Sequence, residues 1–238
     1  MKLIALPYAF GNSAVYYPLE KFLSKEIKLI PVEYAGHFQR YKVPLCYSIR
    51  DMALDVYNEI SDEINEDYAL LGHSMGGIVA YELFNLIRQK GRLLPKHIFL
   101  FAANDPEFPH SYANYEEYST QEIKEVLKTF ENTPKKLLED DYILGLVSPF
   151  VKSDCIAVRD YVPKSGSEYN ISVPVTLLRG DQEKDVEHCK EGWAKYCSAD
   201  FTYKVVPGGH FFLFEENGKR MAEYAKLIED IILPENNK

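Results

Sequence analysis

The sequence carries one serine in a pattern that is typical of nucleophilic catalysis. Gly72, Ser74 and Gly76 have the spacing G-x-S-x-G, after the apolar run Ala69–Leu71 and before an amphipathic segment. A strand, this tight turn and a helix together make a nucleophile elbow, in which the serine hydroxyl is exposed on a strained backbone. The glycines leave room for the turn, because side chains two residues either way would collide with it. We therefore predict that Ser74 attacks a carbonyl group, rather than being an incidental serine in a glycine-rich turn.

A nucleophilic serine needs a base, and one histidine lies in the expected place. His210 follows the last apolar run in the stretch PGGHF and precedes the last helical segment. The two glycines before it allow a fold tight enough to return the imidazole to Ser74. His73, the immediate neighbour of the serine, is expected to point elsewhere and pack in the core. The sequence predicts that His210 takes the serine proton.

The acidic partner of the histidine is less determined, and three carboxylates remain open. It should leave a strand end between the serine and the histidine in the chain. Asp181 and Glu183 follow one apolar run, and Asp105 follows another. The residues alone allow each of them a purely structural role, as a turn former, a solvated side chain or the start of an Asp-Pro loop.

Two backbone amides are expected to stabilise the oxyanion that forms during acyl transfer. Met75 begins the helix after the serine, where the N–H and the helix dipole favour negative charge. The loop Pro7–Asn12 after the first strand is the place for a second donor, at Ala9 or a neighbour. An ordinary strand-to-helix turn is the alternative for that loop.

These residues must be positioned by elements that alternate along the chain. Six short apolar runs predict buried strands at Leu3–Leu6, Leu29–Val32, Ala69–Leu71, Ile98–Ala102, Val173–Leu178 and Tyr203–Val206. Helical periodicity predicts helices over 48–64, with Ser48 as the N-cap, over 76–89, and from about Gly218 to Ile232. The alternation predicts an α/β fold with a mainly parallel sheet and helices on both faces, in one domain over residues 1–238.

One stretch interrupts the alternation. Between Pro106 and Asn170 the patterns are helical: Ser119 and Glu122 have the spacing of a capping box, and Pro134 opens a second short segment. About 60 residues are too many for a plain connection between two strands. The stretch therefore predicts a helical lid, inserted at about residues 106–170, over the carboxyl edge of the sheet.

Composition excludes several other classes of protein. The 238 residues include 27 basic and 36 acidic side chains, a formal charge of −9, which argues against a nucleic-acid binder. Apolar runs fall short of the roughly 18 to 20 residues that span a bilayer, so no membrane association is expected. The four cysteines and six histidines have no disulfide or metal-site spacing. We expect a cytoplasmic monomer without a metal.

The segments together resemble the type II thioesterases that accompany nonribosomal peptide and polyketide synthases, within the α/β-hydrolase fold. The resemblance covers nearly the whole chain and is carried by LPYAFGNSAVYYPL, GHSMGGIVAYEL, ENTPKKLLED, SDCIAVRDY, PVTLLRG, Gly192-Trp193 and PGGHFFL. GHSMG alone occurs in many esterases, whereas PYAxG, GHSMG and PGGHFF at these spacings are much more specific. The resemblance implies hydrolysis of acyl groups from the phosphopantetheine arm of acyl or peptidyl carrier proteins, with no cofactor of the enzyme itself. Such hydrolysis edits stalled assembly lines.

The family pattern can be transferred residue by residue. It makes Ser74 the nucleophile, His210 the base, and the amides of Met75 and Ala9 the oxyanion hole. The family usually has an aspartate three residues after a strand-end glycine, and here that position is Glu183. Glutamate serves in some triads, so Glu183 ranks first, with the two aspartates named above as rivals.

A second departure from the family concerns the acyl entrance. Where the family has two glycines after PYA, this chain has Phe10-Gly11, and the bulky ring is expected to reshape the entrance and affect substrate size. Apolar residues of the insert such as Phe130 and Leu137 are candidates for an acyl channel, although most are expected to pack the lid onto the sheet.

Other functions remain possible with the same motifs. A carboxylesterase or an acyltransferase would use the same triad, and a hydrolase-fold binding protein without catalysis is a further alternative. Carrier proteins are often acidic, as the family resemblance implies. Because this chain is also acidic, we expect a mainly apolar docking surface for them.

Overall fold

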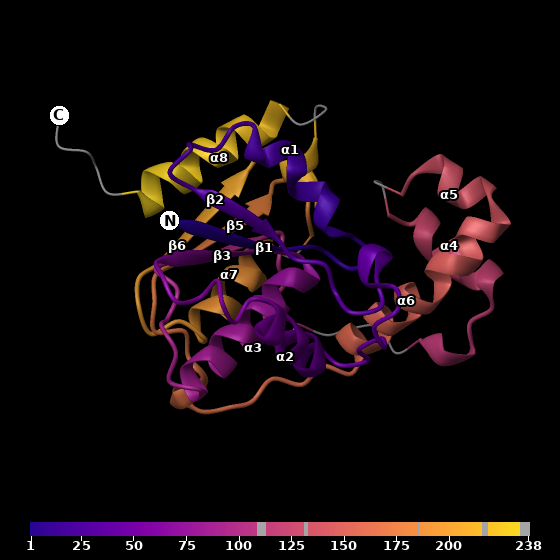
Figure 1. Ribbon diagram of the computed structural model, residues 1–238, viewed down its shortest axis with the longest axis horizontal. Coiled ribbons are helices and arrows are strands. Elements are labelled where there is room, and N and C mark those ends of the chain that lie inside the picture. Colours follow the sequence, from indigo (N-terminus) through magenta and orange to yellow (C-terminus); the bar gives the residue numbers. More distant parts are fainter. Residues whose placement is uncertain (109–112, 131–132, 185, 216–218, 234–238) are drawn as a thin grey trace.

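A parallel sheet forms the centre of the molecule in the computed structural model, which describes residues 1–108, 113–130, 133–184, 186–215 and 219–233. Its six strands lie in the order β2-β1-β3-β4-β5-β6 (Figure 1). Their bounds are β1 Lys2–Leu6, β2 Lys28–Pro31, β3 Tyr68–His73, β4 Ile98–Phe101, β5 Val175–Gly180 and β6 Phe201–Val206. All neighbouring pairs are parallel, so the predicted α/β fold is confirmed.

Helices cover both faces of this sheet. Helices α2 (Ile49–Glu59), α3 (Met75–Gln89) and α7 (Val186–Ala194) lie on one face, and α1 (Tyr17–Glu20) and α8 (Lys219–Ile232) lie on the other (Figure 1). Alternate residues of β1 enter the two cores, with Ile4 on the α2–α3 side and Leu3 on the α8 side. Burial on both faces explains why the inner strands β1, β3, β4 and β5 are mostly apolar, whereas the edge strands β2 and β6 are partly exposed.

The predicted helix ends agree only in part with the structure. Ser48 caps α2 by accepting a hydrogen bond from the Asp51 amide, as predicted, but the helix ends at Glu59 rather than near residue 64. Ile60 and Ile64 are buried beyond its end, so their spacing continues the apolar pattern without a helix. The predicted start of the last helix, Gly218, lies outside the described residues. Helix α7 was not predicted.

The regular elements of the stretch between β4 and β5 are helices, with no strand among its described residues. It contains α4 (Thr120–Lys128), α5 (Lys135–Glu139), α6 (Asp141–Arg159) and the 3-10 turns η3 (Tyr115–Glu117) and η4 (Ser167–Tyr169). Ser119 and Glu122 form the predicted capping box at the start of α4. Helix α6 lies between the body of the molecule and the α4–α5 pair (Figure 1).

The apolar side chains of these helices form a cluster of their own, which we call the insert cluster. Its buried members are Ile123, Leu127, Leu144, Val147, Phe150 and Val151. This corrects the expectation that most of these residues pack onto the sheet, because amphipathic periodicity does not reveal which partner covers an apolar face. No helix in the described part of the chain is long and apolar enough to cross a membrane.

Candidate active site

Ser74 lies on the sharp turn between β3 and α3. Its backbone has φ 55° and ψ −120°, a strained conformation for a residue with a side chain. A Cβ atom on Gly72 would lie 2.3 Å from the Gly76 carbonyl oxygen, and one on Gly76 would lie 2.3 Å from the Leu6 carbonyl oxygen. Only glycine fits at these two positions, which is why the elbow has the G-x-S-x-G pattern.

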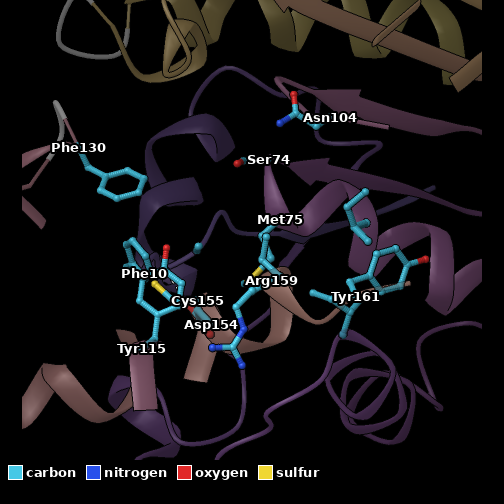
Figure 2. Close-up of a pocket in the computed structure, with 14 residues that line it drawn as sticks. Phe10, Ser74, Met75, Asn104, Tyr115, Phe130, Asp154, Cys155, Arg159 and Tyr161 are labelled. Atoms are coloured by element: carbon cyan, nitrogen blue, oxygen red, sulfur yellow. Dashed lines mark hydrogen bonds between the residues drawn. The ribbon is translucent and has the colours of Figure 1, made fainter. Parts of the chain in front are cut away.

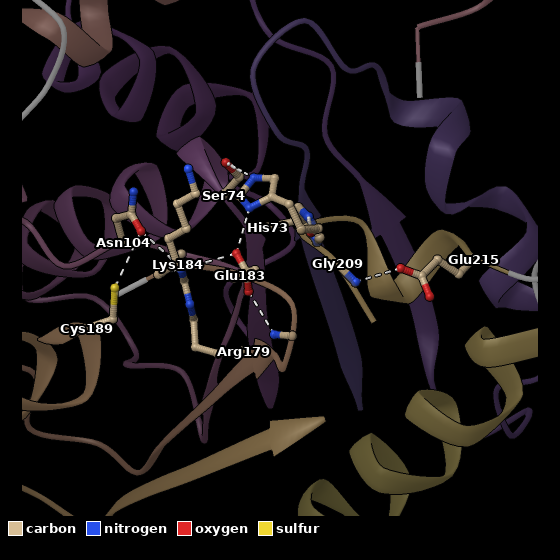
Figure 3. A network of polar contacts seen from close by, with 12 residues as sticks. His73, Ser74, Asn104, Arg179, Glu183, Lys184, Cys189, Gly209 and Glu215 are labelled. Atoms are coloured by element: carbon tan, nitrogen blue, oxygen red, sulfur yellow. Dashed lines mark hydrogen bonds and ion pairs between the residues drawn. The ribbon is translucent and has the colours of Figure 1, made fainter. Parts of the chain in front are cut away.

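The predicted serine, histidine and first-ranked acid are joined in one hydrogen-bonded chain. The Ser74 hydroxyl lies 2.9 Å from Nε2 of His210, and Nδ1 of the same ring lies 2.8 Å from a carboxylate oxygen of Glu183 (Figure 3). Because the carboxylate can only accept, the Nδ1–H donates and the neutral ring presents Nε2 to the hydroxyl proton. This arrangement can withdraw a proton from the serine oxygen.

The two rival carboxylates are occupied elsewhere. Asp181 accepts a hydrogen bond of 2.9 Å from the amide of Gly208 and so supports the loop that carries the histidine. Asp105 is buried and accepts a hydrogen bond from the amide two residues further on. Of the three candidates, the structure brings Glu183 to His210. The order of the strands would allow any of the three carboxylates to approach His210. The geometry of the turn after β5 decides that Glu183 does so.

A buried arginine that the sequence analysis did not single out supports the acid. Nη2 of Arg179 lies 3.2 Å from Glu183, and both side chains are almost completely buried. Nη1 of Arg179 donates to the Asn104 side chain, and the Gly180 amide donates to the second oxygen of Glu183 (Figure 3). A guanidinium and a backbone amide thus hold the carboxylate in place. The sequence feature that could have indicated this role is the arginine at the end of the apolar run in PVTLLRG.

His73 packs in the core, as predicted, among the rings of Tyr8, Phe211 and Phe214. Its Nε2–H donates a hydrogen bond of 2.9 Å to the carbonyl oxygen of His210. Burial, together with the nearby His210, holds the pKa of His73 well below its usual range. The ring is therefore neutral, and it contacts the loop that carries His210 without forming a hydrogen bond to Ser74.

Two backbone amides next to the serine are free to bind an oxyanion. Within the described residues, neither Ala9 nor Met75 donates its N–H to another group, and both line the same cavity as Ser74 (Figure 2). The amide of Phe10 is not available, since it donates to the Asp154 side chain at 2.8 Å. The Ala9 amide, rather than the Phe10 amide, is therefore the second candidate donor to an oxyanion.

A buried ion pair lies behind this loop. Asp154 of α6 contacts Nε2 of His37 at 3.2 Å, and Nδ1 of His37 faces the carbonyl oxygen of Ala35. Burial opposes protonation, but the Asp154 charge and these acceptors raise the pKa of His37 above its ordinary value. The two side chains are 117 residues apart, and no sequence pattern connected them.

The cavity at the serine has a volume of about 250 Å³ and a mainly apolar lining. Asn104, Arg159 and Asp154 provide polar groups, and Ile78, Phe130 and Tyr161 are among the apolar walls (Figure 2). Among the described residues, no three histidine, cysteine or acidic side chains are grouped as metal ligands would be. The site has the parts for acyl transfer through a serine, with hydrocarbon surface beside it.

The fold and the site together define an α/β hydrolase. The chain belongs to the thioesterase family: the family model described as "Thioesterase domain" matches residues 1–232. The family and the fold that the sequence resemblance implied are confirmed, and the chain is a hydrolase that acts on thioesters.

Individual relatives are similar over nearly their full length. The gramicidin S biosynthesis protein GrsT of Aneurinibacillus migulanus is 27% identical, over 98% of this chain and 91% of GrsT. The medium-chain S-acyl fatty acid synthase thioesterase of Rattus norvegicus is also 27% identical, over 96% of this chain and 88% of its own. The crystal structure of ClbQ, from the colibactin NRPS/PKS pathway, has a TM-score of 0.86 and 26% identity, covering 97% of each chain.

Proposed function

We propose that this chain is a type II thioesterase, which removes acyl groups from the phosphopantetheine arm of carrier proteins and thereby edits stalled nonribosomal peptide or polyketide synthases. The chain of hydrogen bonds from Ser74 through His210 to Glu183, beside two free amides, carries the proposal. ClbQ supports the choice of substrate, because its description places it in an NRPS/PKS pathway, and GrsT is named as a biosynthesis protein of gramicidin S.

The first half of the reaction forms an acyl-serine. His210 takes the proton of Ser74 as the serine oxygen attacks the thioester carbonyl carbon, and the negative oxygen binds the amides of Met75 and Ala9. Glu183 keeps the ring in the required tautomer and stabilises its charged form. The C–S bond then breaks, and the imidazolium returns its proton to the departing pantetheine thiol.

The second half releases the acid. Water enters the position of the thiol, and His210 takes one of its protons as the oxygen attacks the acyl-serine carbonyl. The same two amides bind the second oxyanion. When the C–O bond to the serine breaks, His210 protonates the serine oxygen and the free enzyme is restored.

The helices α4, α5 and α6 act in this proposal as a lid on a single domain of residues 1–238, inserted at about 106–170. They are supported in this role by their place beside the cavity, to which Phe130 and Cys155 contribute. We further propose that the protein works as a cytoplasmic monomer and that its partners dock through a mainly apolar surface. Carrier binding that weakens steeply with salt would argue against such a surface.

The direct test is turnover of matched substrates by wild type and Ser74→Ala. Wild type should hydrolyse acyl-pantetheine and acyl-carrier thioesters in preference to oxygen esters with the same acyl group, and Ser74→Ala should lose turnover. A fluorophosphonate should label wild type at Ser74. A preference for oxygen esters would identify an esterase, acyl transfer to an added amine would identify a transferase, and absence of both labelling and turnover would identify a binding protein.

A further inference from the structure

Two aromatic rings stand between the cavity at the serine and a second cavity. Phe10 and Phe130 line both spaces, and their ring centroids lie 4.9 Å apart at an interplanar angle of 87°. Phe10 comes from the loop after β1, and Phe130 follows helix α4. Figure 2 shows both side chains on one side of the pocket that contains Ser74. The edge-to-face contact joins the oxyanion loop to the lid helices.

The second cavity has hydrocarbon walls. Its volume is about 220 Å³, and half of the residues that line it come from the lid, among them the apolar Leu127, Leu137, Val147 and Phe150. Each cavity alone is smaller than the roughly 300 to 1,000 Å³ of pockets that hold drug-sized ligands, whereas the two joined would fall within that range. A space of this chemistry suits an alkyl chain rather than a polar group.

The backbone at Phe10 makes the ring an unusual choice. Its φ is 69°, in the left-handed region that glycine adopts without strain and bulky residues rarely adopt. The Asp154 side chain holds the Phe10 amide in this conformation. A phenyl ring in a position where glycine fits without strain indicates that the ring itself has a role at the site.

We propose that the contact between Phe10 and Phe130 closes the acyl cavity and restricts the enzyme to short acyl groups. Removal of either ring would open the second cavity to the end of a longer acyl chain. The inference rests on the proposed thioesterase function and names the substrate class that the site selects, namely thioesters of short acyl groups.

The test compares kcat/KM over a series of acyl-pantetheine thioesters from acetyl to decanoyl. Wild type should favour the short members. In Phe10→Gly and in Phe130→Ala, the ratio of octanoyl to acetyl kcat/KM should rise about tenfold or more, the discrimination that a few methylene groups give in an apolar pocket. Glycine fits the backbone at position 10, so that variant should fold. Tyr142→Ala, at an exposed position of α6, is the matched control and should keep the wild-type profile.

A double variant tests whether the second cavity causes the rise in the ratio of octanoyl to acetyl kcat/KM. Leu137→Trp fills the second cavity, so adding it to Phe10→Gly should restore the short-chain profile. Active single variants with an unchanged profile would overturn the inference, and so would a lengthened profile that Leu137→Trp leaves unaltered. If Phe10→Gly is inactive, the Phe130→Ala profile decides by the same criterion. Absence of thioester turnover in wild type would instead overturn the proposed function.

Discussion

The ring of His73 holds the backbone of His210 in place through a hydrogen bond of 2.9 Å from Nε2 to the carbonyl oxygen. His73, the neighbour of the proposed nucleophile Ser74, therefore supports the proposed base His210, although His73 and His210 are 137 positions apart. The ring is neutral because burial disfavours its charged form, so it supplies a donor without placing a second positive charge beside His210.

Replacing His73 by leucine should reduce turnover. Without its donor the His210 carbonyl loses a partner, and a shift of the imidazole by about 1 Å costs up to about 10²-fold in rate. The measurement is kcat together with the rate of Ser74 labelling by a fluorophosphonate. His188→Gln, at an exposed histidine, serves as the control. Equal labelling rates in wild type and His73→Leu would refute the positioning role.

Replacing Glu183 by glutamine should lower kcat by about 10⁴-fold, the scale seen when the triad acid becomes an amide. The amide group can donate to Nδ1 and so favour the tautomer that cannot take the serine proton. Asp181→Asn and Asp105→Asn are matched controls, and each should retain kcat within about tenfold. A larger loss in either control than in Glu183→Gln would assign the acid elsewhere.

Replacing Asp154 by leucine should destabilise the fold. The change leaves His37 and the Phe10 amide without their acceptor in a buried site, which typically costs about 3 to 5 kcal/mol. Asp154→Asn, which keeps one oxygen acceptor, should lose less. Urea unfolding of the two variants measures the difference in the free energy of unfolding. Equal losses would mean that the carboxylate charge, rather than the acceptor, stabilises this site.

Stability should fall in mild acid through His97. Burial beside Thr176 lowers the pKa of this histidine to about 4, below the ordinary value of about 6.5. A histidine with a depressed folded pKa contributes stability that is present above pH 6.5 and is lost as the pH falls from there through 4. The loss should be about 2 kcal/mol, and His97→Gln should flatten the profile between pH 7 and 4.5. An identical profile in that variant would show that another group causes the acid sensitivity.

The sequence predicted the parts of this molecule that depend on local pattern. Apolar runs indicated all six strands, most clearly the inner strands β1, β3, β4 and β5, because the inner strands of a parallel sheet are covered on both faces. The elbow at Ser74 was visible because its glycines are required by contacts within a few residues and with one neighbouring strand.

Other features depend on contacts that no local pattern encodes. The pairing of Asp154 with His37 and the place of Arg179 beside Glu183 follow from how separate elements pack. Helix α6 was not predicted as one unit, because Pro149 lies inside it and prolines normally interrupt helices. Which carboxylate reaches His210 depends on the path of the turn after β5. The spacing of residues in the sequence does not determine that path.

Helix α6 is tied to the body of the molecule at its inner end. Asp154 holds the Phe10 amide and His37, and Tyr161, just after the helix, donates to Glu82 of α3. Helices α4 and α5 lie beyond α6, on the side away from the sheet (Figure 1). If α4, α5 and α6 moved together as a rigid body when a substrate bound, the loop after β1 that contains Ala9 would be distorted. A displacement of α4 and α5 alone would separate Phe130 from Phe10 and widen the cavity, while Asp154 of α6 kept its hydrogen bond to the Phe10 amide. Admission of a substrate and the shape of the loop at Ala9 can therefore vary independently.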